Sequence, residues 1–210
     1  MARLIVWRHG ESEWNAVARF QGQTDTNLTA LGRQQAAVAA AQLSKLEPVA
    51  IVSSDLRRAA DTAAALAAST GLEVVLDPRL RERHFGQWQG KTLSEIEATW
   101  PMEFAGWRVG EPVLGCGVEH LEDLGKRTAA ALREAADRAP GSTVVVVTHG
   151  AAAREGCGAL LGWPDHVRRT LATLRNCRWT ELRTDPVRGW VLHAHNVGSG
   201  GTAGAGVASE

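Results

Sequence analysis

The chain has 210 residues, with 23 lysines and arginines balanced by 23 aspartates and glutamates, so its formal net charge is +0. This balance excludes a global basic field for nucleic-acid binding, so any anion affinity must come from a local cluster of charges. The length suits one α/β domain, no apolar stretch is long enough to span a bilayer, and the three cysteines lack paired spacing. We therefore expect a cytoplasmic protein with no membrane or nucleic-acid partner.

Short apolar runs alternate with alanine-rich stretches along most of the chain. The runs predict strands at 3–7, 49–53, 73–76 and 143–148, and further candidates at 177–183 and 190–195. The stretches between them predict helices at 29–46, 56–70, 119–138 and 151–161, the first with Thr29 as its N-cap. This alternation predicts an α/β fold of three layers, α/β/α, in which helices flank a mostly parallel sheet.

Two segments fall outside this rhythm. Residues 84–118 are rich in glycine and tryptophan, and we expect an irregular excursion over one end of the sheet, in which Trp88 and Trp107 are candidates to line a pocket. Residues 198–210 have no apolar periodicity and are expected to be a disordered tail. The remaining residues, 1–197, are expected to form a single domain.

Ionisable or hydrogen-bonding residues follow four of the predicted strands or open the helices behind them. Open α/β sheets place their ligands at the carboxyl ends of parallel strands, so these residues are expected to converge on one crevice. The set consists of Arg8, His9 and Asn15 after the first strand, Arg58 after the second, Glu82 after the third, and His149 with Gly150 after the fourth.

These residue types suit phosphoryl transfer without a metal ion. Arg8 and Arg58 would bind phosphate oxygens, with His149, Asn15 and the Gly150 N–H as further donors. His9 would attack phosphorus through a neutral ring nitrogen while a backbone carbonyl holds the other one. Glu82 would protonate the leaving group and later activate water. Singly, each residue has a structural alternative, such as a solvated Arg57–Arg58 pair or a surface salt bridge at Glu82.

Together these motifs resemble the histidine phosphatase superfamily, which includes the cofactor-dependent phosphoglycerate mutases. The resemblance is carried by Arg8-His9-Gly10-Glu11-Ser12 with Trp14-Asn15, by Ser54-Asp55-Leu56-Arg57-Arg58-Ala59, and by Glu82 and His149. It implies a phosphoglycerate mutase-like fold, His9 as the phosphorylated residue, Arg8, Asn15 and Arg58 as phosphate ligands, Glu82 as the proton donor and no cofactor. Arg58, rather than Arg57, takes the arginine role because it directly precedes Ala59.

Within the family, three features favour a phosphatase over a mutase. The first is Gln21-Gly22-Gln23, which resembles the phosphatase branch and places Gln21 and Gly22 in the substrate site. The second is Phe85, which replaces a tyrosine of the mutases. The third is the segment from Gly90 to Glu119, which is shorter than in the mutases and lacks their paired arginines. The segment Ile51–Ala59, the Gln21-Gly22-Gln23 turn and Asn176 with Trp179 resemble more closely the actinobacterial glucosyl-3-phosphoglycerate phosphatases. That similarity implies a phosphorylated glycerate or sugar substrate, with glucosyl-3-phosphoglycerate as one candidate, and a possible homodimer. Before the helix predicted at 119–138 this chain has Val118-Glu119-His120, where relatives commonly have Gly-Glu-Ser, a difference that bears on the shape of the substrate pocket.

Three other functions compete with a phosphomonoesterase. The first is a cofactor-dependent phosphoglycerate mutase. The second is a zinc hydrolase that uses His193 and His195 with His84 or His149, although these lack a metal-binding spacing with a carboxylate, and we predict no metal site. The third is a phosphate-binding module without catalysis, for which the acid Glu82 would have no purpose.

Overall fold

The computed structural model describes residues 1–198, so the predicted tail at 198–210 lies outside the described residues from 199 on. Six strands form one sheet in the order β3-β2-β4-β1-β5-β6. The strands are β1 (Arg3–Arg8), β2 (Ala50–Ser53), β3 (Val74–Leu76), β4 (Thr143–Thr148), β5 (Trp179–Asp185) and β6 (Gly189–Val197). All six predicted strands are present.

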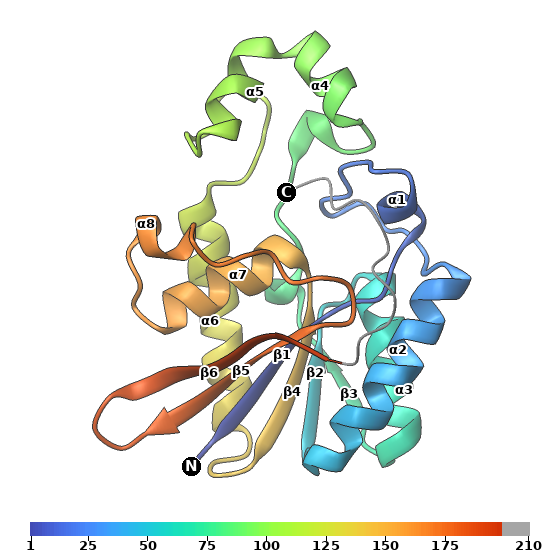
Figure 1. The fold of residues 1–210 in the computed structure, drawn as a ribbon, viewed down its shortest axis with the longest axis vertical. Helices are drawn as coiled ribbons and strands as arrows, with labels where there is room; N and C mark the ends of the chain where they lie inside the picture. Colours follow the sequence, from blue (N-terminus) through green and yellow to red (C-terminus); the bar gives the residue numbers. More distant parts are fainter. Residues whose placement is uncertain (199–210) are drawn as a thin grey trace.

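The first four strands of this order, β3, β2, β4 and β1, run parallel, while β5 and β6 add an antiparallel edge beside β1. Register aligns the carboxyl ends of the parallel strands, because Arg8 lies opposite Thr148 and Ser53 lies opposite Val147. The residues that follow these strands therefore emerge at one edge of the sheet, on the side of α4 and α5 (Figure 1).

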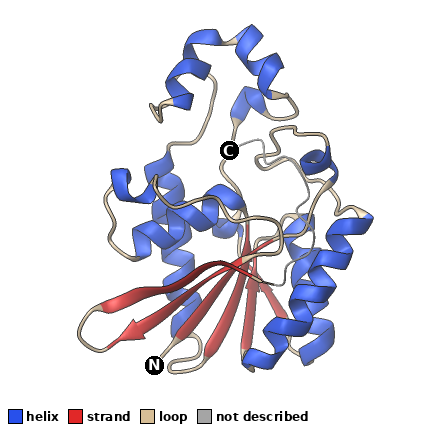
Figure 2. Cartoon of the chain, viewed as in Figure 1, coloured by secondary structure: helices blue, strands red, loops and turns tan. Residues whose placement is uncertain are grey.

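Helices cover both faces of the sheet, which confirms the predicted three layers (Figure 2). The helices are α1 (Glu13–Ala16), α2 (Ala30–Leu43), α3 (Arg57–Thr70), α4 (Leu93–Thr99), α5 (Pro101–Arg108), α6 (Leu121–Asp137), α7 (Gly150–Leu160) and α8 (Asp165–Arg168), with 3-10 turns at Ser44–Leu46, Pro78–Leu80 and Gly86–Trp88. Among residues 1–198 no helix combines the length and the apolar character needed to cross a bilayer.

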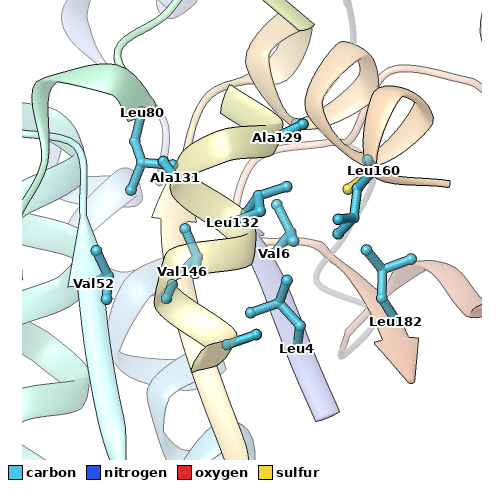
Figure 3. Packing of buried hydrophobic residues seen from close by; sticks show 14 of the residues in the cluster. Leu4, Val6, Val52, Leu80, Ala129, Ala131, Leu132, Val146, Leu160 and Leu182 are labelled. Atoms are coloured by element: carbon cyan, nitrogen blue, oxygen red, sulfur yellow. The ribbon is translucent and has the colours of Figure 1, made fainter. Parts of the chain in front are cut away.

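Alternate side chains of β1 pack into two separate cores. Ile5 and Trp7 face α2 and α3, whereas Leu4 and Val6 face α6 and α7, where they meet Leu132 and Leu160 (Figure 3). Burial on both faces explains why the central strands are unbroken apolar runs instead of alternating patterns. As predicted, Thr29 caps α2, because its side chain accepts a hydrogen bond from the Gly32 N–H.

Residues 84–118 form an excursion over one end of the sheet, as predicted, but the prediction that this excursion is irregular is wrong. This segment, called the cap below, contains α4 and α5 above the carboxyl edge of the sheet (Figure 1). It has its own core, in which Trp88 is fully buried among Phe85, Ile96 and Phe104, and Phe20 from outside the cap completes it. Trp88 thus packs the cap, whereas the partly buried Trp107 also lines a cleft between the cap and the helices α6 and α7.

Candidate active site

His9 is the first residue after β1 and is only 2% exposed. Its Nδ1 lies 2.7 Å from the carbonyl oxygen of Gly10. Because a carbonyl only accepts hydrogen bonds, Nδ1 carries the proton in this arrangement and Nε2 keeps its lone pair. Burial, with Arg58 and Arg8 nearby, lowers the pKa of His9 well below its ordinary value of 6.5. The ring is therefore neutral and its Nδ1 is held by a backbone carbonyl, which is the geometry expected of a nucleophile.

The Gly10 backbone fixes this arrangement from two sides. Its N–H donates to the Thr62 hydroxyl at 3.1 Å, and Thr62 in turn donates to the Arg58 carbonyl. On the other side Gly10 approaches α2 so closely that a β-carbon would lie 2.3 Å from the Gly32 carbonyl oxygen. Only glycine permits this backbone contact, so the loop after β1 is held between α2 and α3.

Arg8 and Arg58 are buried cations beside His9, with exposures of 5% and 0%. Arg8 Nη1 donates to the Leu174 carbonyl at 2.6 Å, and Arg58 donates to the carbonyls of Gly22 and Thr24 at 2.7 and 2.9 Å. Arg57 instead has a side chain that is 60% exposed, near Asp25. The burial of Arg58 and the exposure of Arg57 agree with the choice of Arg58 as the candidate ligand.

His149 brings the end of β4 to the same place. Its ring lies edge to face with that of His9, with centroids 5.0 Å apart, and its Nε2 lies 2.9 Å from Ser54 Oγ. Burial first, and then Arg58 and His9, lower the pKa of His149 well below 6.5. The ring's other nitrogen, Nδ1, is buried and has no hydrogen-bond partner within residues 1–198.

Glu82 is 3% exposed and joins the site through the first turn of α7. Its carboxylate accepts hydrogen bonds from the backbone N–H groups of Ala151 and Ala152 at 3.2 and 3.0 Å, and from Arg83 N–H at 2.8 Å. These hydrogen bonds fix the Glu82 carboxyl group at the N-terminus of α7. Since α7 begins directly after His149, this contact ties Glu82 to the second histidine.

Arg127 of α6 holds the backbone that carries Glu82. Its guanidinium donates to the carbonyls of Arg79, Arg81 and Glu82 at 2.6 to 2.9 Å. Both oxygens of Glu119 accept from it as well, at 2.7 and 2.9 Å. Glu119 also accepts from the His84 N–H. The Arg127–Glu119 pair thus links α6, the cap and the segment of the general-acid candidate.

The remaining predicted residues surround this centre. Asn176 donates to the His9 carbonyl and to Asn15 Oδ1, which also accepts from Ser12, so the Asn15 amide nitrogen is the group left to donate. Gln21 Oε1 accepts from the hydroxyls of Ser12 and Thr26 at 2.6 and 2.8 Å, which likewise assigns its amide nitrogen as a donor.

The two glycines of the predicted site, Gly22 and Gly150, lie next to Arg58 and His149 through their backbones. Gly22 has a positive φ of 53° and places its carbonyl on Arg58. Gly150 is the first residue of α7, behind His149. Ser54, Thr62 and Arg127 also contact the predicted residues. Ser54 and Thr62 belong to the motif that resembles the family but were given no role from the sequence, and Arg127 was not considered, because these contacts join residues distant in the chain.

Two histidines of the zinc hypothesis, His84 and His195, form hydrogen bonds with other groups. His195 contacts the Thr180 hydroxyl and the Ala172 carbonyl, and His84 Nδ1 contacts the Gly117 carbonyl. Within the described residues no three His, Cys, Asp or Glu side chains gather in a way that could hold a metal ion. The geometry does not support the zinc hypothesis.

Several known proteins are similar to this chain in sequence and fold. It is 42% identical over 187 residues to a glucosyl-3-phosphoglycerate phosphatase of Mycolicibacterium vanbaalenii, covering 86% of this chain and 83% of that one. A probable phosphoglycerate mutase of Yersinia enterocolitica is 35% identical over 207 residues, covering 92% of each. The solved structure of a mycobacterial glucosyl-3-phosphoglycerate phosphatase complexed with VO3 superposes with a TM-score of 0.86 at 39% identity, covering 94% of this chain and all of that one. The sequence profile of the histidine phosphatase superfamily (branch 1) matches residues 4–198, and the chain belongs to this family.

Proposed function

We propose that this protein hydrolyses small phosphate monoesters without a metal ion, through a phosphohistidine formed on His9. The observation that carries the proposal is the His9 ring itself, buried beside two arginines with Nδ1 held by the Gly10 carbonyl. A neutral ring nitrogen with a fixed direction is what nucleophilic attack on phosphorus requires.

In the first step, His9 Nε2 attacks phosphorus and the bond between phosphorus and the ester oxygen breaks. Glu82, in its protonated form, gives its proton to the departing alkoxide. The ring becomes cationic on phosphorylation, and the Nδ1–H bond to Gly10 stabilises that charge. The phosphoryl oxygens would be bound by Arg8, Arg58 and His149, by the amides of Asn15 and Gln21, and by the Gly150 N–H. Stabilising the negative charge on these oxygens is the main requirement for catalysis of this reaction.

In the second step, water attacks the phosphorus of phosphohistidine. The Glu82 carboxylate removes a proton from the water, the bond between Nε2 and phosphorus breaks, and inorganic phosphate leaves. This restores neutral His9 and protonated Glu82, so both steps balance without a cofactor.

Hydrolysis is favoured over mutase chemistry, and a phosphorylated glycerate or sugar is the substrate class. The phosphatase relatives support both parts, and glucosyl-3-phosphoglycerate is the specific candidate. In addition, Phe85 stands where the mutases have a tyrosine and lacks that residue's hydroxyl. Its ring is 1% exposed and packs edge to face on Phe20, with ring centroids 4.9 Å apart, so it contributes to the cap core instead of contacting a substrate. The cytoplasmic location and the homodimer belong to the same proposal, and sedimentation of the purified protein tests the dimer.

The test combines product analysis with trapping. Purified protein is incubated with glucosyl-3-phosphoglycerate, 3-phosphoglycerate and sugar phosphates, with and without chelator, and free phosphate is measured. We expect chelator-resistant release and an acid-labile phosphoryl group on His9 in quenched samples. His9→Ala that still hydrolyses these esters would overturn the proposal. Rapid 2-phosphoglycerate formation from 3-phosphoglycerate and a bisphosphate primer, with little free phosphate, would instead establish the mutase.

A further inference from the structure

A loop without helix or strand structure, residues 172–176, lies between α8 and β5 and crosses the carboxyl edge of the sheet (Figure 1). It contacts the proposed active site at two points. The Leu174 carbonyl accepts a hydrogen bond from Arg8 Nη1 at 2.6 Å, and the Asn176 amide donates to the His9 carbonyl at 3.1 Å. The loop therefore contacts both a proposed phosphate ligand and the proposed nucleophile.

A bulge near the end of β6 holds this loop. There two residues of β6, His195 and Asn196, lie opposite a single residue of β5. A β-bulge redirects the side chains that it carries, and Asn196 has a φ of 56°, in the left-handed region that asparagine adopts more readily than most residues. His195 Nε2 lies 2.7 Å from the Ala172 carbonyl. Asn196 bonds the backbone of Thr173 and Arg175, so the bulge connects β6 to the loop at both residues.

The Asn196 amide acts on the peptide group that contacts Arg8. Its Oδ1 accepts from the Arg175 N–H at 2.9 Å, and its Nδ2 donates to the Thr173 carbonyl at 3.3 Å. The Arg175 N–H and the Leu174 carbonyl belong to one peptide group, which is planar and trans. They therefore point in opposite directions, one to Asn196 and the other to Arg8. Fixing the N–H on one side fixes the direction of the carbonyl on the other.

Hydrophobic packing alone does not set this direction. The Leu174 side chain is 1% exposed in the core, which fixes the place of the loop, but an apolar contact has no direction of its own. Arg8 is also buried, and its Nε has no hydrogen-bond partner within residues 1–198. Because a guanidinium binds phosphate through a planar fork, the bond from Nη1 to Leu174 sets the plane in which the other N–H groups meet phosphate oxygens.

His195 attaches the beginning of the same loop. Because a carbonyl only accepts hydrogen bonds, His195 Nε2 carries the proton in the contact with Ala172, and Nδ1 accepts from the Thr180 hydroxyl at 2.8 Å. Thr180 is 1% exposed and lies in β5, the strand next to β1. The loop is thus attached to the sheet through His195 by contacts that do not involve Asn196.

We propose that Asn196 is a positioning residue whose amide orients Arg8 for the phosphate group of the substrate, through the peptide group that joins Leu174 to Arg175. His195 supports this arrangement by holding Ala172. The inference rests on the proposed function, in which Arg8 binds phosphate. It makes phosphate affinity depend on β6, a strand that supplies none of the predicted site residues.

The test uses Asn196→Gly, because glycine adopts a positive φ without strain and removes only the two side-chain hydrogen bonds. We expect the Kd of inorganic phosphate, measured by calorimetry, to rise about five- to tenfold, and kcat/KM for p-nitrophenyl phosphate to fall by a similar factor. His195→Ala, which removes the other attachment, is the second variant and should change both quantities in the same direction. His193→Gly, at an exposed position of the same strand, is the matched control and should change neither.

A second background distinguishes positioning from a general loss of stability. Arg8→Lys keeps a cation for phosphate but has no planar fork to orient, so adding Asn196→Gly should change the phosphate Kd by less than about twofold. An equal loss of affinity in both backgrounds would show a purely structural role and overturn the inference. Unchanged phosphate affinity in Asn196→Gly and His195→Ala would overturn it as well. Wild-type protein that binds phosphate but releases none from any ester would contradict the proposed function alone.

Discussion

The imidazole rings of His9 and His149 lie edge to face, with centroids 5.0 Å apart and planes inclined by 61°. Both rings are buried, and Arg58 and Arg8 disfavour protonation of each of them. A proton added to either ring would meet this positive field and repel the other ring. The pair is therefore neutral near pH 7, which preserves the lone pair that His9 needs.

This neutrality makes folding stability depend on pH. The folded-state pKa of both histidines is below 6.5, so the unfolded chain binds more protons as the pH falls. Stability is then complete above pH 6.5 and is lost below it, by up to about 1.4 kcal/mol per pH unit for each histidine. Denaturant titrations from pH 7 to pH 5 should show this loss, and His149→Asn should reduce its slope. A free energy of unfolding that stays constant over this range would contradict the prediction, since the ordinary carboxyl pKa values of 3.8 and 4.5 lie lower.

The role of Glu82 predicts a dependence on the leaving group. Glu82→Gln keeps the size of the side chain but cannot supply a proton to an alkoxide. We expect kcat/KM for alkyl phosphates, which reports the first step alone, to fall by about 10²–10⁴, with a smaller loss for p-nitrophenyl phosphate, whose leaving group needs little protonation. Steady-state kinetics on both esters measure this difference. Equal losses of kcat/KM on the two substrates would show that Glu82 does not act as the acid in the first step.

Arg127 is expected to act through Glu82 as a positioning residue. Arg127→Lys removes the planar fork that spans three carbonyls and Glu119, and one ammonium group cannot replace it. The free energy of unfolding should fall by about 1.5–3 kcal/mol. In addition, kcat/KM should fall more for alkyl phosphates than for p-nitrophenyl phosphate, as with Glu82→Gln. Arg133→Lys on the exposed side of the same helix is the control. A loss of stability without this kinetic pattern would limit Arg127 to a structural role.

The sheet and the residues at its carboxyl edge were predictable from the sequence because both depend on local patterns. The runs Leu4–Trp7 and Val144–Val147 are apolar on both faces, and Arg8, His9 and His149 follow directly behind them. Parallel pairing then brings these residues together without any need to know individual contacts. Their convergence agrees with the prediction that the strand ends share one crevice.

The two helices of the cap were missed, although two local signals for them were present. Thr92 and Glu95 form a capping box at the start of α4, and Pro101 occupies the first turn of α5. The abundance of glycine and tryptophan obscured these signals. Arg127 had no such signal, because its partners Arg79, Arg81 and Glu82 are more than forty residues away along the chain.

Gly10 should not tolerate a side chain, even a methyl group. In Gly10→Ala the β-carbon would lie 2.3 Å from the Gly32 carbonyl oxygen, and neither backbone can move without disturbing α2 or the carbonyl that orients His9. We expect a loss of about 1–3 kcal/mol in unfolding free energy and a lower kcat. Gly106→Ala in α5 is the matched control: its β-carbon would meet only the flexible Glu111 side chain, at 3.2 Å, and alanine favours a helix by about 1 kcal/mol. If thermal unfolding and turnover of Gly10→Ala equal those of the wild-type protein, the close contact of this loop with α2 does not orient the nucleophile.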